Sequence, residues 1–210
     1  MILDIHSHRS APYSQGVVCI DNFESPLLSG QLYSAGIHPW ETTMEPDSQM
    51  WTQLENLASK KEVVAIGECG VDLIKGGPLF RQLQILKRQI ELSEHYAKPL
   101  VLHCVKGADI LMGLKRDLAP KQPWIIHGFR GKPGLAAQLV DKGFYISFGE
   151  KFNPDTVLMM PGDRILAETD ESILDITQII ESLSVAANSD LTDEIAANTG
   201  IVLGILNTAD

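Results

Sequence analysis

The chain has 210 residues, 44% of them hydrophobic, and a formal net charge of −10. This composition supplies a buried core and excludes a disordered chain, and no apolar stretch is long enough to span a membrane. The N-terminus starts with a strand-like run, so we expect no signal peptide and a soluble cytoplasmic protein without a membrane partner. The acidic balance argues against broad nucleic-acid binding unless cations or metal ions gather locally.

Short apolar runs rich in β-prone residues recur along the chain. There are eight: Ile2–Ile5, Val17–Ile20, Leu32–Ile37, Val63–Ile66, Leu100–Leu102, Trp124–Ile126, Phe144–Phe148 and Ile165–Ala167. From the third run onward they alternate with segments of helical pattern: Ser48–Lys60, Leu79–Ala97, Ala108–Leu118, Pro133–Lys142, Asn153–Met160, Ser172–Ala186 and Leu191–Leu206. Hydrophobic strands separated by helices indicate a parallel sheet covered on its outer face. The pattern predicts a (β/α)8 TIM-type barrel, in one domain over residues 1–210.

The first two connections of this barrel are unusual. Residues Arg9–Gly16 and Asp21–Gln31 are too short, and too rich in Ser, Pro and Gly, to hold full crossover helices. We therefore expect the first two helices to be missing. Their absence explains how eight strands fit a chain shorter than the roughly 250 residues usual for this architecture.

The first strand carries Asp4, His6 and His8 at alternate positions, so their side chains share one face. Neutral imidazole is a common metal ligand, and two imidazoles at a strand end are able to reach one ion. Asp4, one layer deeper, is placed to accept a ring N–H and fix the tautomer of a ligand. The alternative is a pair of histidines that fill space with local hydrogen bonds. Ligands elsewhere in the chain decide between the two.

Further metal-binding residue types lie at the ends of later predicted strands: His38, Glu68, His103, His127 and Asp170. The carboxyl ends of barrel strands are where such folds hold their active sites. His95 is the exception among the six histidines, since it lies in a polar helical segment and is expected at the surface. Even four of these histidines, together with the two carboxylates, exceed the needs of one tetrahedral ion. They fit two ions roughly 3.5–4 Å apart, bridged by a carboxylate and suited to hydrolysis by an activated water.

The motifs in this order and spacing resemble the TatD family of metal-dependent hydrolases, within the amidohydrolase-like barrels. They are Asp4-x-His6-x-His8, Gly36-x-His38-Pro39, Ile66-Gly67-Glu68-x-Gly70-x-Asp72, His103, His127-x-Phe129 and Glu168-Thr169-Asp170. The resemblance implies a divalent-metal deoxyribonuclease that acts on DNA from the 3′ end. It implies six metal ligands: His6, His8, Glu68, His103, His127 and Asp170. Glu68 would bridge the two ions, and Asp170 would also orient or deprotonate the attacking water, which makes these two the expected catalytic residues.

Other residues are expected to support the ligands or to contact the substrate: Asp4, His38, Asp72, Lys106, Arg130 and Glu168. Arg9 and Lys75 also follow strand ends and would add positive charge for phosphates. The rim differs from the family pattern, with Val105 where an arginine is usual and Leu73–Pro78 replacing an aromatic stretch. Hydrolysis of a small amide, lactone or phosphoester is therefore an alternative to DNA, and a catalytically retired metal-binding protein is another. The metal identity stays open among Mg, Mn and Zn.

Overall fold

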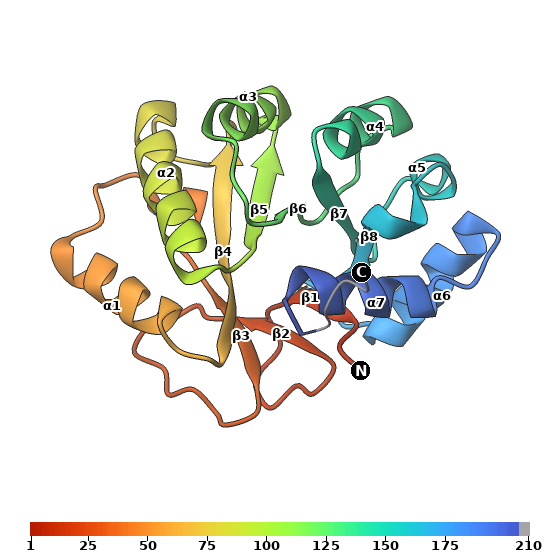
Figure 1. Ribbon diagram of the computed structural model, residues 1–210, viewed down its shortest axis with the longest axis horizontal. Helices are drawn as coiled ribbons and strands as arrows, with labels where there is room; N and C mark the ends of the chain where they lie inside the picture. Colours follow the sequence, from red (N-terminus) through yellow and green to blue (C-terminus); the bar gives the residue numbers. More distant parts are fainter. Residues whose placement is uncertain (206–210) are drawn as a thin grey trace.

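The structure is a computed structural model that describes residues 1–205. Its eight strands are β1 (Asp4–Ser7), β2 (Gly16–Cys19), β3 (Leu32–Ala35), β4 (Val63–Asp72), β5 (Leu100–Val105), β6 (Trp124–Ile126), β7 (Phe144–Phe148) and β8 (Ile165–Ala167). All neighbouring strands are parallel and in chain order, and β8 pairs with β1 to close the barrel. The predicted (β/α)8 barrel is therefore confirmed. Figure 1 shows the strands at the centre with helices around them.

The helices follow the strands from β3 onward. They are α1 (Ser48–Ala58), α2 (Leu79–Tyr96), α3 (Ala108–Leu118), α4 (Pro133–Asp141), α5 (Pro154–Leu158), α6 (Ile176–Ala187) and α7 (Thr192–Val202), with 3₁₀ turns η1 (Pro39–Glu41) and η2 (Gly162–Arg164). None of the helices within residues 1–205 has the length and apolar content that a membrane crossing requires.

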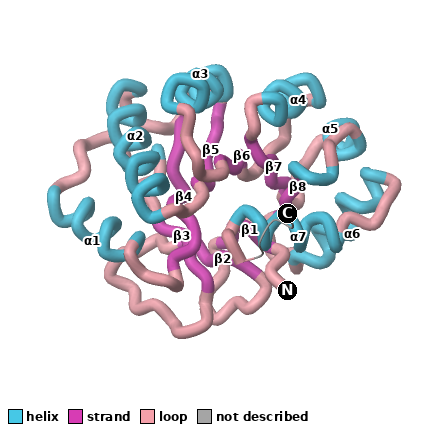
Figure 2. Tube along the Cα trace, in the orientation of Figure 1, coloured by secondary structure: helices cyan, strands magenta, loops and turns pink. Residues whose placement is uncertain are grey.

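Loops without helices connect β1 to β2 and β2 to β3, as expected from the sequence (Figure 2). Their apolar side chains take part of the role of the missing helices. Tyr13 from the first loop, and Phe23 and Leu27 from the second, pack against the buried cluster that contains Val18 and Tyr33. Burying apolar area in this way stabilises the barrel wall where no helix covers it.

Apolar side chains from six strands form a cluster with the end of α7. The strand residues are Ile5, Val17, Ala65, Val101, Ile125 and Leu166, and they pack with Val202 and Leu203. A larger cluster joins β4–β8 to the helices α2–α7. These two clusters pack against both faces of the strands. The strand ends, which carry the polar side chains, are therefore held rigidly.

Strands β4 and β5 are longer than the sequence predicts. The apolar runs end at Ile66 and Leu102, but pairing continues through Gly70↔His103 to Asp72↔Val105. Glu68 and His103 therefore lie inside strands and not at their ends. Periodicity misses this extension because hydrogen bonds between neighbouring strands, and not local hydrophobicity, hold it.

The predicted start of α6 was also wrong. The helix begins at Ile176 and not at Ser172, because Asp175 and Gln178 form a capping box there. Helix α7 ends at Val202, and Leu206, the predicted end, lies outside the described residues. The extent of the domain over residues 1–210 stays a prediction.

Candidate metal centre

A cavity of about 1040 Å³ opens at the carboxyl end of the barrel, and most of the predicted ligands line it. His8, Glu68, His103, His127 and Asp170 are on its wall. His6 is fully buried directly behind them, with its Nε2 3.3 Å from Glu68 Oε2. Parallel strands end on the same side of a barrel, which is why residues up to 164 positions apart meet here. The structure thus brings all six predicted ligands together.

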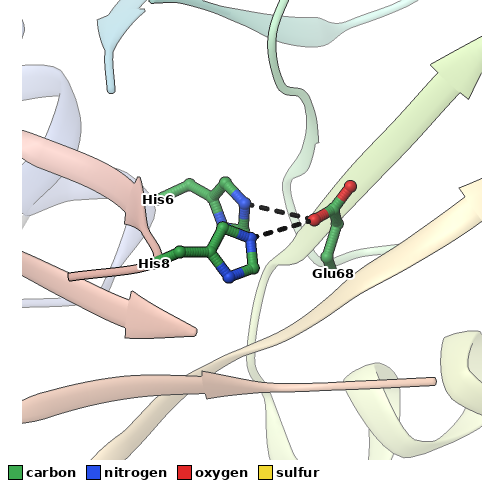
Figure 3. Close-up of side chains that lie close together, drawn as sticks. All are labelled: His6, His8 and Glu68. Atoms are coloured by element: carbon green, nitrogen blue, oxygen red, sulfur yellow. Dashed lines mark ion pairs between the residues drawn. The ribbon is translucent and has the colours of Figure 1, made fainter. Parts of the chain in front are cut away.

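Glu68 is the centre of this group. Its Oε2 faces the rings from β1, at 3.3 Å from His6 Nε2 and 3.6 Å from His8 Nε2 (Figure 3). Its Oε1 faces the opposite side, at 2.6 Å from His103 Nδ1 and 2.7 Å from His127 Nε2. One carboxylate is therefore shared by two separate sets of nitrogen donors. This arrangement matches a carboxylate that bridges two ions.

The electrostatics of the group are strongly coupled. Burial opposes a charge on Glu68, but the histidines, led by His127, hold the pKa of Glu68 well below its usual range. The Glu68 carboxylate in turn raises the pKa of His8 to about 9 and, against burial, the pKa of His127 well above its ordinary value. Metal ions bind only the deprotonated imidazole, so ion and protons compete for these rings.

Buried acceptors orient the two rings on the Oε1 side of Glu68. His127 Nδ1 lies 3.2 Å from Glu168 Oε1, and His103 Nε2 lies 3.2 Å from Asp72 Oδ2. A ring N–H donated to a carboxylate leaves the other ring nitrogen free to bind a metal. The nitrogens left free are those that face Glu68. Glu168 and Asp72 therefore occupy the supporting positions expected for them.

His38 is held in a different tautomer. The backbone N–H of Trp40 donates to His38 Nδ1 at 3.1 Å, so this nitrogen is an acceptor. In the neutral ring the proton must then be on Nε2, which lies 3.0 Å from Glu68 Oε1. A nitrogen that carries a proton cannot bind a metal. His38 is a hydrogen-bond donor beside the centre, which agrees with its predicted supporting or substrate-contacting role.

His6 provides a test of whether a metal fits. Both of its ring nitrogens are buried and lack a hydrogen-bond partner among the described residues, although Nε2 is 3.3 Å from a carboxylate oxygen. A fully buried imidazole with no partner is costly, since it has lost its hydration. A cation between Nε2 and the carboxylates of Glu68 and Asp170 would give Nε2 a partner. The residues present therefore fit a divalent ion.

Asp170 completes the side near β1. Its Oδ1 lies 3.9 Å from His6 Nε2 and 3.8 Å from His8 Nε2. Its backbone is left-handed, with φ of 51°, and is held by hydrogen bonds to the backbones of His6 and His8. Such conformations in non-glycine residues are maintained only where the surroundings fix them. Burial, reinforced by Glu168, raises the pKa of Asp170, which improves it as a proton acceptor.

Asp4 does not have the expected contact with an imidazole ring. Its carboxylate accepts hydrogen bonds from the Tyr13 hydroxyl, the backbone N–H and hydroxyl of Thr169, and the backbone N–H of His6. The pairing of β1 with β2 shifts register between Asp4 and Ser7, while His6 and His8 still face the same oxygen of Glu68. Asp4 instead joins β1 to the segment that carries Asp170.

The predicted cations differ in their availability. Lys75, Lys106 and Arg130 are exposed and line the cavity. Arg9 does not, because its guanidinium donates to the backbone oxygens of Ser172 and Leu174. The expectation that Arg9 contacts a phosphate is therefore corrected. His95 lies exposed on α2, as expected.

Two residues of the centre were missed in the sequence. Asp21 Oδ1 lies 3.1 Å from His8 Nδ1 and takes the orienting role that had been expected of Asp4. It follows the second strand, so the strand-end pattern that identified the others would have found it. Trp40 lines the cavity and donates its indole N–H to Asp72. Trp40 directly follows the His38-Pro39 motif in the sequence, and this position could have identified it as a residue of the site.

The chain is similar in sequence to known proteins. The sequence model of the family described as "TatD related DNase" matches residues 28–196. An "Uncharacterized metal-dependent hydrolase YjjV" of Escherichia coli (strain K12) is 34% identical over 152 residues, which are 66% of this chain and 58% of that protein. A "Putative deoxyribonuclease TATDN1 homolog" of Enterocytozoon bieneusi is 31% identical over 148 residues, 64% of this chain and 53% of that protein. The chain thus spans little more than half the length of these curated relatives.

Two solved structures share the fold. The crystal structure of the E. coli K12 TatD homolog YjjV superposes with a TM-score of 0.81 at 20% sequence identity, covering 98% of both chains. A TatD family hydrolase from Entamoeba histolytica superposes with a TM-score of 0.76 at 16% identity, covering 95% of both. At these identities the superpositions support the barrel architecture alone.

Proposed function

The chain belongs to the TatD family of metal-dependent hydrolases, and we propose that it is a phosphodiesterase of the deoxyribonuclease type that works with two divalent ions. The observation that carries this proposal is the position of Glu68 between two donor sets. One set contains His6 and His8, and the other contains His103 and His127. A shared carboxylate with nitrogen donors on both sides is the arrangement that two neighbouring ions require.

The proposed ligands divide between the two sides of Glu68. His6, His8 and Asp170 would hold one ion with Glu68, and His103 and His127 would hold the other. The ions would supply Lewis acidity and lower the pKa of a bound water. Nitrogen and carboxylate donors of this kind accept Zn, Mn or Mg, so the native ion is decided by measurement.

In the proposed hydrolysis, the Asp170 carboxylate accepts the proton of the attacking water. The water oxygen forms a new bond to phosphorus, the bond to the leaving oxygen breaks, and the proton passes from Asp170 to that oxygen. A carboxylate at this position acts first as general base and then as general acid. The Nε2–H of His38 points into the same centre and is placed to donate to a phosphoryl oxygen.

The cations on the cavity wall favour a phosphate substrate. Lys75, Lys106 and Arg130 come from the loops that follow β4, β5 and β6. Phosphate oxygens are recognised by such side chains without regard to sequence. The E. bieneusi relative, named as a putative deoxyribonuclease, supports DNA as the polymer.

A specific observation also favours a second candidate, hydrolysis of a small phosphoester, amide or lactone. Asp21, Glu24, Glu41 and Glu171 line the same cavity, and the formal net charge is −10. This acidic part of the rim repels a long polyanion and leaves room for a small substrate. The same ions would polarise a carbonyl oxygen.

The test compares substrates with and without metal. Protein purified without chelator is first analysed for bound metal, then assayed on a single-stranded DNA oligonucleotide, a small phosphodiester, an amide and a lactone, each with Mn²⁺, Zn²⁺ or Mg²⁺ and with EDTA. The proposal expects metal-dependent cleavage of the oligonucleotide. Cleavage of only the small substrates would support the second candidate. Inactivity with verified metal loading would support a retired metal-binding protein.

A further inference from the structure

Trp40, Phe23 and Phe129 line the cavity, and of these three side chains Trp40 is the exposed one, at 47%. The other two tryptophans are covered, Trp51 being 6% exposed and Trp124 fully buried. An exposed indole next to a polar centre costs apolar hydration free energy. The metal centre as proposed makes no use of its ring face, so the exposure calls for another function.

The indole is held rigidly close to the centre. Its Nε1–H donates to Asp72 Oδ2 at 2.7 Å, and the same carboxylate oxygen contacts His103 Nε2. The ring centroid of Trp40 lies 4.7 Å from that of His38 and 5.9 Å from that of His103. Because Asp72 holds both Trp40 and His103, the distance between the indole and the reacting position is fixed. A planar group stacked on it would have a defined position relative to the scissile bond.

A movable cation covers this ring. Lys75 Nζ lies 4.5 Å from the Trp40 ring centroid, and the Lys75 side chain is exposed. A cation over an exposed aromatic face is weakly held. An incoming planar ring is therefore able to replace the ammonium on the indole. The displaced ammonium stays at the cavity wall, where it is free to meet a phosphate.

We propose that Trp40 and Lys75 form a nucleobase subsite, in which the base beside the scissile phosphate stacks on the indole and the lysine pairs with a phosphate of the same nucleotide. This inference rests on the proposed phosphodiesterase function and specifies its substrate as a nucleotide. A flat ring and a cation together suit a base attached to a phosphate, whereas an amide or lactone needs neither. The cavity, at about 1040 Å³, has room for both groups.

Tryptophan fluorescence tests binding directly. Because Trp51 and Trp124 are covered, quenching by an added ligand reports on Trp40. Metal-loaded protein is titrated with 2′-deoxyadenosine monophosphate, 2-deoxyribose 5-phosphate or inorganic phosphate. We expect saturable quenching by the nucleotide only, and its loss in Trp40→Phe. Equal quenching by deoxyribose phosphate would show an anion site without base stacking, and no quenching by any probe would overturn the subsite.

Kinetics provide a second measurement. The substrates are a single-stranded oligonucleotide and the same oligonucleotide with tetrahydrofuran abasic residues at the cleaved end. Stacking contributes on the order of 1–3 kcal/mol per base, so Trp40→Ala should raise KM on the intact substrate by roughly 5- to 150-fold more than on the abasic one. Trp40→Phe should restore most of this difference, because phenylalanine keeps a stacking face.

Phe80→Ala is the matched control, because Phe80 is 61% exposed but does not line the cavity. It should affect the two substrates equally. Equal losses on both substrates for Trp40→Ala would overturn the subsite. Metal content is measured for every variant, since Trp40 also contacts Asp72. If no phosphodiester is cleaved at all, the proposed function fails, and the fluorescence titration still decides whether the base binds.

Discussion

Glu68 Oε1 lies 2.7 Å from His127 Nε2, so a carboxylate on β4 meets a ring that follows β6 across the mouth of the barrel. Burial would favour a neutral Glu68, yet the neighbouring histidines, led by His127, keep its pKa well below the usual range. The surrounding histidines therefore stabilise the anionic form of Glu68. The anionic Glu68 carboxylate contacts both sets of donors, His6 and His8 on one side and His103 and His127 on the other.

The first prediction compares Glu68→Gln with His38→Ala. Glutamine keeps the shape of Glu68 but removes the charge shared by both donor sets, so metal content and turnover should both fall, turnover by at least about 100-fold. His38→Ala removes a single hydrogen-bond donor and should cost less, with metal content retained. Single-turnover assays with metal analysis measure both. A larger effect of His38→Ala would mean that the ligands are wrongly assigned.

The second prediction concerns metal removal. EDTA should abolish activity and lower the melting temperature, because a ligand that binds only the folded state stabilises it. At a free metal concentration of 100 times Kd the stabilisation is about 2.7 kcal/mol, or roughly 5–10 °C for a chain of this size. Differential scanning calorimetry with and without EDTA measures the shift in melting temperature. In the Glu68→Gln variant, EDTA should change the melting temperature only slightly. An unchanged melting temperature after verified metal removal would contradict the metal centre.

The third prediction separates Asp170 from Glu168. Asp170→Asn keeps one coordinating oxygen but removes the proton acceptor, so turnover at saturating metal should fall by roughly 10²–10⁴-fold while metal content falls much less. Glu168 contacts His127 and not the reacting position. Glu168→Gln should weaken metal affinity by about 10–100-fold, and excess metal should restore most of the activity. Near-normal turnover of Asp170→Asn would show that Asp170 is not the general base, and Glu68 would be the next candidate.

The fourth prediction tests the contact between Asp21 and His8. Asp21→Asn should weaken metal affinity by about 10–100-fold, because a neutral amide would replace the negatively charged acceptor of the His8 ring N–H. Competition with a metal-binding dye measures this affinity. Glu24→Gln is the matched control, since Glu24 is an exposed acid on the same loop that contacts Gln53 and no histidine. Equal losses in both variants would indicate a general charge effect instead of a specific contact.

The fifth prediction concerns pH and lies outside the metal centre. Burial lowers the pKa of Lys115 to about 8, against the nearby Glu94, while its Nζ lies 5.1 Å from the ring centroids of Trp124 and Phe144. The unfolded chain then binds more protons than the folded one between pH 8 and about 10.5, so this group makes stability rise with pH in that range. Below pH 8 the buried charge is destabilising.

Lys115→Met should therefore stabilise the protein below pH 8, by a few kcal/mol at most at ~1.4 kcal/mol per pKa unit, and the gain should shrink towards pH 10.5. Urea unfolding at several pH values measures it. Lys142→Met, at an exposed lysine paired with Asp141, serves as the control and should show no such pH dependence. Destabilisation by Lys115→Met at all pH values would mean that the ring contacts outweigh burial.

The sequence by itself determined the barrel, because each strand and helix contains a local hydrophobic pattern, although β4 and β5 extend beyond theirs. The eight apolar runs and the Ser- and Gly-rich segments after the first two predict the strand order and the missing helices. Strand-end position marked the candidate ligands, His38 among them, and the resemblance to the TatD family selected the six proposed ligands from these candidates. Their convergence follows from the parallel arrangement alone.

Only the tertiary structure decided which side chains touch. The extension of β4 that places Glu68 between two donor sets depends on pairing with β5. Asp4 bonds to Tyr13 and Thr169 and not to an imidazole ring, and Asp21, in the loop after β2, contacts His8 instead. The tautomer of His38 depends on a backbone N–H two residues away in a 3₁₀ turn. Hydrogen bonds have short range and strict direction, so contacts between distant segments are settled by packing and not by local pattern.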